Sequence, residues 1–118
     1  MVRKCREKIR VKICNITNKE DALAFLSVIN LGEIIYTVGR RLGNEAASGI
    51  LHDVLLLPIK LAEVTLDRVL ASAQIKAHHA VSYADAFAVT LAQELNAAVV
   101  TGDLEFKQVE ALVNLIWL

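Results

Sequence analysis

Near the start of the chain, hydrophobic residues recur every three or four positions, at Val2, Cys5, Ile9, Ile13 and Ile16. This spacing predicts an amphipathic helix over residues 2–16. Ile9, Val11 and Ile13 also alternate with polar residues, so a strand over residues 8–14 is the competing interpretation. We take the helix as the prediction for this segment.

From residue 23 onward the pattern alternates between short apolar runs and segments of helical spacing. Strands are predicted at 23–29, 58–64, 97–101 and 113–118, and helices at 31–42, 45–55, 66–76, 83–95 and just after Asp103. Asn30, Asn44, Thr65 and Ser82 are the expected helix starts, and Gly43 is an expected helix end. Alternating strands and helices predict an α/β fold with three layers (α/β/α), a mostly parallel sheet and helices on both faces.

Three acidic residues stand where predicted strands meet predicted helices. Glu33 and Asp85 lie in the first turns of two helices, and Asp103 directly follows a buried strand. In open α/β sheets, ligands bind outside the carboxyl ends of the strands, close to helix N-termini. Carboxylates clustered at that edge predict a site for a hard divalent cation such as Mg²⁺ or Mn²⁺.

Each acid also has a purely structural interpretation. Asn30-x-x-Glu33 and Ser82-x-x-Asp85 have the spacing of capping boxes, and Asp103 is a possible N-cap for the helix that contains Phe106. An acid at a helix start can cap the helix and still offer an oxygen to a cation. Both interpretations therefore stay open for all three residues.

The composition favours a folded intracellular protein. The 118 residues are 55% hydrophobic, with five glycines and one proline, which predicts one domain over residues 1–118. No apolar run reaches the ~18 residues of a membrane span, and no apolar segment follows the charged N-terminus as in a signal peptide. We expect reduced cysteines and a cytoplasmic location, because Cys5 and Cys14 would point to opposite sides of a helix.

The net charge is zero, but the charges are unevenly distributed. Six of the thirteen basic residues lie within residues 3–12, beside the single acid Glu7. We call this segment the basic arm. It could contact RNA phosphates, or it could be an ordinary solvated helix face.

The ordered motifs resemble those of the PIN-domain family, and within it the small VapC-type toxins of toxin–antitoxin pairs. The matching stretches are Ser27-Val28-Ile29-Asn30-Leu31-Gly32-Glu33, then Ser82-Tyr83-Ala84-Asp85-Ala86-Phe87, then Val99-Val100-Thr101-Gly102-Asp103 with Phe106. Such proteins usually begin with a hydrophobic strand that ends in an Asp. Here no Asp precedes Asp21, so relative to the family we expect an N-terminally truncated domain without the first strand.

The resemblance implies a Mg²⁺-dependent endoribonuclease that hydrolyses RNA phosphodiester bonds, impaired by the loss of the first Asp. Glu33, Asp85 and Asp103 would be the catalytic and metal-binding residues, with Thr101 in support and Glu105 as an outer ligand. The alternative is a non-catalytic PIN-like protein that binds an antitoxin or RNA.

The resemblance also implies a VapB-like antitoxin as partner and a homodimer or higher oligomer. Two features of the sequence agree with assembly. The helices over 34–42 and 46–55 are apolar enough to leave an exposed patch, and an absent central strand would leave sheet edges for a second chain to cover.

Overall fold

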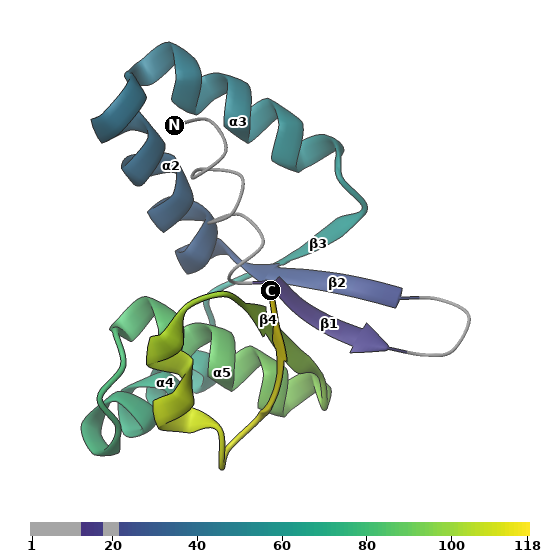
Figure 1. Ribbon diagram of the computed structural model, residues 1–118, viewed down its shortest axis with the longest axis vertical. Coiled ribbons are helices and arrows are strands. Elements are labelled where there is room, and N and C mark those ends of the chain that lie inside the picture. Colours follow the sequence, from purple (N-terminus) through teal and green to yellow (C-terminus); the bar gives the residue numbers. More distant parts are fainter. Residues whose placement is uncertain (1–12, 18–21) are drawn as a thin grey trace.

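The computed structural model describes residues 13–17 and 22–118 (Figure 1). Its centre is a five-stranded sheet with the strand order β3-β2-β1-β4-β5. Four strands run in one direction, while β1 is antiparallel to both of its neighbours. The strands are β1 (Ile13–Thr17), β2 (Ala22–Ser27), β3 (Ile59–Ala62), β4 (Ala98–Thr101) and β5 (Asn114–Trp117).

Strand β1 corrects the expectation for the start of the chain. The predicted helix over residues 2–16 is wrong from Ile13 onward, where the chain is a strand, and its remainder lies outside the described residues. The centre of the sheet is filled, since Ile13 is in register with Leu26 of β2 and with Val100 of β4. Two inner edges with unsatisfied backbone groups are a strong demand for a partner, which outweighs a helical spacing of side chains.

The helices agree closely with the pattern of the sequence. They are α2 (Val28–Leu42), α3 (Asn44–Leu56), α4 (Leu66–His78), α5 (Tyr83–Leu95) and the short 3₁₀ helix η1 (Leu104–Val109). Gly43 ends α2 with φ +92°, a conformation that favours glycine. Thr65 and Ser82 cap α4 and α5 as predicted, each accepting a backbone N–H with its side chain.

The start of α2 differs from the prediction. Asn30 is not the N-cap, because Ser27 caps the helix and accepts a hydrogen bond from the N–H of Ile29 at 3.2 Å. The helix therefore begins about one turn earlier than expected, Asn30 is its third residue and Glu33 lies beyond its first turn. The capping box predicted for Asn30 and Glu33 is wrong.

Helices cover both faces of the sheet, as the neighbouring residues Phe25 and Leu26 of β2 make clear. Leu26 is fully buried in one hydrophobic cluster with Ile34 and Val38 of α2. Phe25 packs against a second cluster, which is built mainly from α5, β4 and η1. Successive side chains of a strand point to opposite faces, so the fold has the expected three layers. None of the described helices is long and apolar enough to cross a bilayer.

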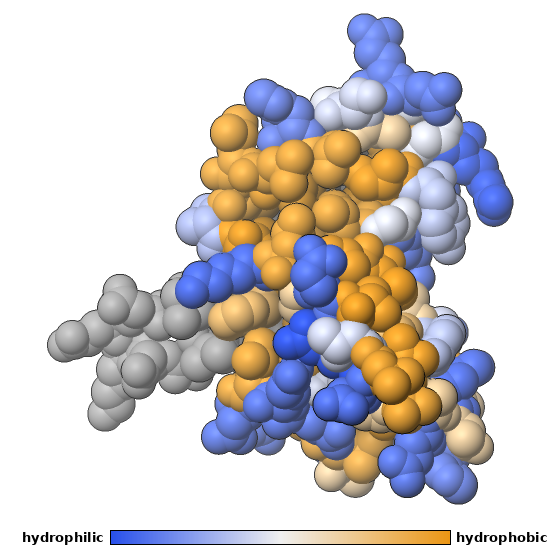
Figure 2. Space-filling model, turned by 180° about the vertical axis from the view of Figure 1, so that it is seen from behind, coloured by the Kyte–Doolittle hydropathy of each residue, from blue (hydrophilic) through white to orange (hydrophobic). Residues whose placement is uncertain are grey.

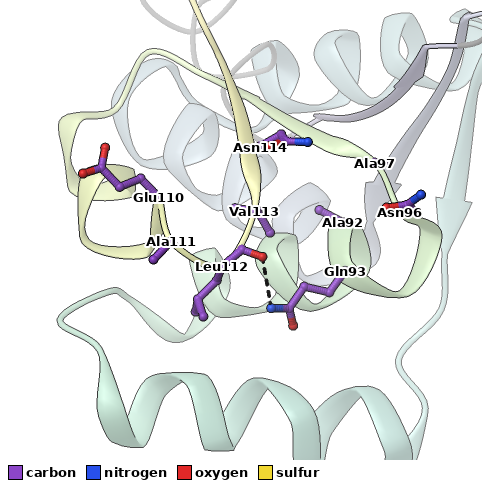
Figure 3. A pocket seen from close by; sticks show the side chains of 9 residues that line it. All are labelled: Ala92, Gln93, Asn96, Ala97, Glu110, Ala111, Leu112, Val113 and Asn114. Atoms are coloured by element: carbon purple, nitrogen blue, oxygen red, sulfur yellow. Dashed lines mark hydrogen bonds between the residues drawn. The ribbon is translucent and has the colours of Figure 1, made fainter.

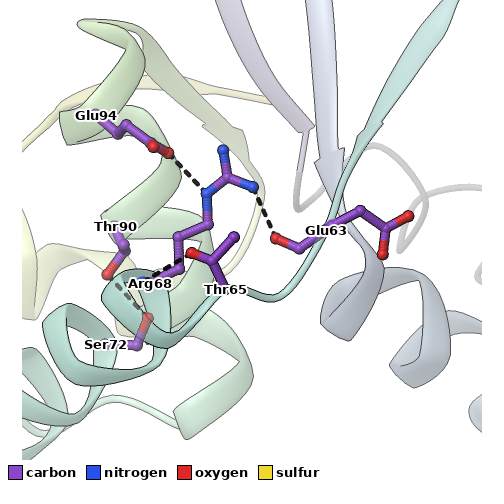
Figure 4. Close-up of polar contacts among 6 residues, drawn as sticks. All are labelled: Glu63, Thr65, Arg68, Ser72, Thr90 and Glu94. Carbon is purple, nitrogen blue, oxygen red and sulfur yellow. Dashed lines mark hydrogen bonds and ion pairs between the residues drawn. The ribbon is translucent and has the colours of Figure 1, made fainter.

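Polar contacts fasten α4 to α5 (Figure 4). The buried hydroxyl of Ser72 donates a 2.9 Å hydrogen bond to Oγ1 of Thr90. Nearer the surface, Arg68 pairs with Glu94 at 2.8 Å and donates to the carbonyl of Glu63 at 2.7 Å. These contacts fix the loop between β3 and α4 against α5, the helix that carries Asp85.

Candidate metal centre

Asp85 is held at the start of the most buried helix described. Its backbone N–H donates to the capping oxygen of Ser82 at 3.1 Å, which confirms the first half of the predicted capping box. Every α5 residue from Asp85 to Ala92 is buried, and Asp85 itself is only 2% exposed. Since α5 leads back into β4, its N-terminus lies at the carboxyl edge of the sheet. A carboxylate is thus fixed, nearly out of contact with solvent, at the edge where ligands bind.

Asp103 is held by hydrogen bonds within its own loop. The N–H of Asp103 donates to Oγ1 of the fully buried Thr101 at 3.0 Å, and Oδ1 of Asp103 accepts from the N–H of Glu105 at 3.0 Å. The predicted N-cap for the following helix is therefore confirmed. The hydroxyl of Thr101 supports the backbone of Asp103, which was the second of its two possible roles.

Three carboxylates meet at this edge. Asp85, Asp103 and Glu105 each offer one oxygen, and these oxygens lie within 4.8 Å of one another. Burial decreases from Asp85 through the half-buried Asp103 to the exposed Glu105, so the group opens towards solvent on one side. Oxygen ligands at this spacing fit a hard divalent cation, which takes two or three carboxylates and completes its shell with water.

Glu33 is not one of these three residues. It lies half-buried on α2, and the group found among the described residues contains Glu105 in its place. A contact nevertheless brings α2 to the site: Nδ2 of Asn30 donates to the carbonyl of Ala84, next to Asp85, at 2.8 Å. Glu33 stands three residues after Asn30 and therefore lies near the same side of the helix. Its role as a ligand stays a prediction.

Other residues considered from the sequence lie elsewhere or have a structural contact. His78 ends α4 and His79 caps it, so these histidines are not the loop that was expected. The ring of Tyr83 packs on Phe87 with centroids 5.1 Å apart, while 44% of the residue stays exposed. The guanidinium of Arg40 lies 5.8 Å from the ring centre of Tyr36 on α2.

A separate cavity of about 190 Å³ lies at the other end of α5 (Figure 3). Gln93 and Asn96 line it from the end of α5, opposite Leu112 and Asn114 before and at the start of β5. Across it, Nε2 of Gln93 donates to the carbonyl of Leu112 at 3.3 Å. Because Asp85 is at the N-terminus of α5, this cavity is not part of the carboxylate group.

Comparison with known proteins identifies the family. The PIN domain model matches residues 6–112. Among solved structures, the chain is similar to one from the DNA-bound VapBC complex of Salmonella typhimurium, with a TM-score of 0.63 and 20% sequence identity over 78% of this chain and 73% of that one. No significant match was found among curated proteins. The chain belongs to the PIN-domain family.

Proposed function

We propose that this protein is a divalent-metal-dependent endoribonuclease of the VapC type. The observation that carries the proposal is the group of Asp85, Asp103 and Glu105 at the carboxyl edge of the sheet in a PIN-domain chain. Carboxylates gathered at one point repel each other unless a cation or protons offset their charge. Metal-assisted hydrolysis of a phosphodiester is the chemistry that such a group supports best.

Asp85 and Asp103 would hold Mg²⁺ or Mn²⁺, with Glu33 as a third ligand and Glu105 at the exposed rim. When bound, the cation neutralises phosphate charge, activates water and stabilises the leaving oxygen. Asp85 or Asp103 orients the attacking water by accepting one of its hydrogens. The buried Thr101 keeps the turn that presents Asp103 in place. The family's first Asp has no counterpart before Asp21, so we expect weak cleavage.

The test is RNA cleavage with Mg²⁺ and with a chelator. Asp85→Asn and Asp103→Asn should each lower the rate by at least about tenfold, since loss of a ligand should cost no less than loss of a group supporting one. Asp53→Asn, which changes an exposed acid on α3, is the matched control and should cleave normally. Cleavage that survives the chelator, or full activity in both site variants, would refute the proposal.

The second candidate is a non-catalytic PIN-like protein that binds an antitoxin or RNA. The missing first Asp favours it, because fewer ligands hold a cation less tightly. Calorimetric titration with Mg²⁺ or Mn²⁺ separates the two candidates. Binding that Asp85→Asn abolishes would count against the non-catalytic protein, whereas an absence of both binding and cleavage would favour it.

We also propose a homodimer, with a VapB-like antitoxin as a further partner. The patch predicted on α2 is largely buried, since Ile34 and Val38 pack in the core. The exposed leucines and valine instead follow the end of α3, strand β3 and the first half of α4, with exposed fractions from 37% to 72%: Leu55, Leu56, Leu57, Leu61, Val64, Leu66 and Leu70. Figure 2 shows a broad band of apolar side chains on the back of the molecule.

A second copy of the chain suits this surface, because β3 is an edge strand among the described strands and can pair with its own copy. Light scattering at micromolar concentration should therefore give a dimer or larger species. Leu56→Glu combined with Leu66→Glu should shift it to monomer, and Leu104→Glu, at an exposed leucine of η1 outside this surface, should not. A well-folded monomer of the unchanged chain would contradict the assembly.

A further inference from the structure

Asn30 has an unusual environment for an amide side chain. The residue is fully buried, and its Nδ2 donates to the carbonyl of Ala84 at 2.8 Å. Its Oδ1 is also buried, but accepts no hydrogen bond within the described part of the chain. Most buried polar atoms have a partner, and one without a partner is costly. An oxygen kept in this state calls for an explanation beyond packing.

The position of Asn30 suggests that explanation. Ala84 directly precedes Asp85, so the bond from Asn30 joins α2 to the first turn of α5. Glu33 follows Asn30 by three residues on α2, on nearly the same side of the helix. Asn30 is thus the described link between the helix that carries Glu33 and the helix start that carries Asp85.

We propose that Asn30 is a positioning residue of the metal centre, an inference that rests on the proposed function. Its Nδ2 fixes α2 against α5, so that Glu33 and Asp85 are held towards one cation. Its Oδ1 accepts a hydrogen bond from a water of the hydrated ion, since Mg²⁺ keeps several of its waters when it binds to proteins. Such a water would satisfy the buried oxygen, as ordered waters commonly do.

The experiment compares two buried hydrogen bonds between helices. Asn30→Leu keeps the approximate volume and removes both polar atoms, and Asn30→Ala is a smaller variant that favours the helix. Ser72→Ala is the matched control, because Ser72 is equally buried and bonds Thr90 between α4 and α5 without touching an acidic residue. For each chain, Mn²⁺ affinity is measured by calorimetry, and urea unfolding is measured without metal.

We expect both Asn30 variants to raise the Kd for Mn²⁺ by about tenfold, as loss of a group that orients ligands typically does. Ser72→Ala should lower the urea midpoint while leaving the Kd unchanged. In an Asp85→Asn background, the effect of Asn30→Leu on the Kd should shrink, because residues that act through each other are not additive.

The outcomes separate the two proposals. An unchanged chain that binds no Mn²⁺ overturns the proposed function and this inference together. Binding that Asn30→Leu and Asn30→Ala leave intact overturns this inference alone. An equal loss of affinity in Ser72→Ala would also overturn it, because general loosening of the fold would then explain the result.

Discussion

Replacing Asn15 by proline tests the central position of β1. Asn15 is in the middle of the strand and is in register with Ala24 of β2 and with Ala98 of β4. Every backbone N–H of a strand with two neighbours points towards one of them. Proline at this position therefore removes a ladder hydrogen bond whichever neighbour receives it, and proline is rare in central strands for that reason.

The expected cost is large for a chain of this size. The partner carbonyl loses its donor inside the sheet, which costs about 1–3 kcal/mol, and the proline ring crowds the adjacent strand. A total of about 3 kcal/mol is a substantial part of the roughly 5–15 kcal/mol that stabilises a typical domain. With an m value of about 1.5 kcal/mol/M, the urea midpoint should fall by about 2 M.

Urea unfolding followed by circular dichroism measures this shift, and Asn15→Thr is the control. Threonine keeps the backbone N–H and favours strands, so its midpoint should stay within about 0.5 M of the unchanged chain. A proline variant that also stays within about 0.5 M would show that residues 13–17 do not form the centre of the sheet. An equal fall in both variants would assign the effect to the asparagine side chain instead of the backbone.

Three further results are expected. Thr101→Val should destabilise the fold by about 1–2 kcal/mol, because the N–H of Asp103 loses its acceptor; calorimetry should also show weaker Mn²⁺ binding, unlike Thr90→Val, which breaks a buried bond away from the acids. Asn96, which ends α5 with φ +51°, should cost about 1–2 kcal/mol when changed to alanine and little when changed to glycine, as measured by urea unfolding. Neutralising the basic arm should weaken RNA binding and reduce its salt dependence by about 0.7 per lost phosphate contact, a prediction from charge alone because residues 3–12 lie outside the described residues; an unchanged salt slope would contradict it.

The sequence by itself determined the features that depend on near neighbours. Ser82 caps α5 through the N–H of Asp85, and Asp103 caps η1 through the N–H of Glu105, so both contacts close within three residues. Alternation of strands and helices likewise predicted the layers, because each element must bury its own apolar side. These interactions form wherever the local residues allow them, and a single sequence is enough to recognise them.

Only the tertiary structure decided the start of the chain and the role of Asn30. The spacing of residues 2–16 suits both a helix and a strand, and the open sides of β2 and β4 selected a strand for residues 13–17. Asn30 precedes an acid by three residues, as a cap would, yet Ser27 is the cap, because β2 ends there. The partner of Asn30 is 54 residues away, and a contact across that separation arises only when the whole sheet brings α2 and α5 together.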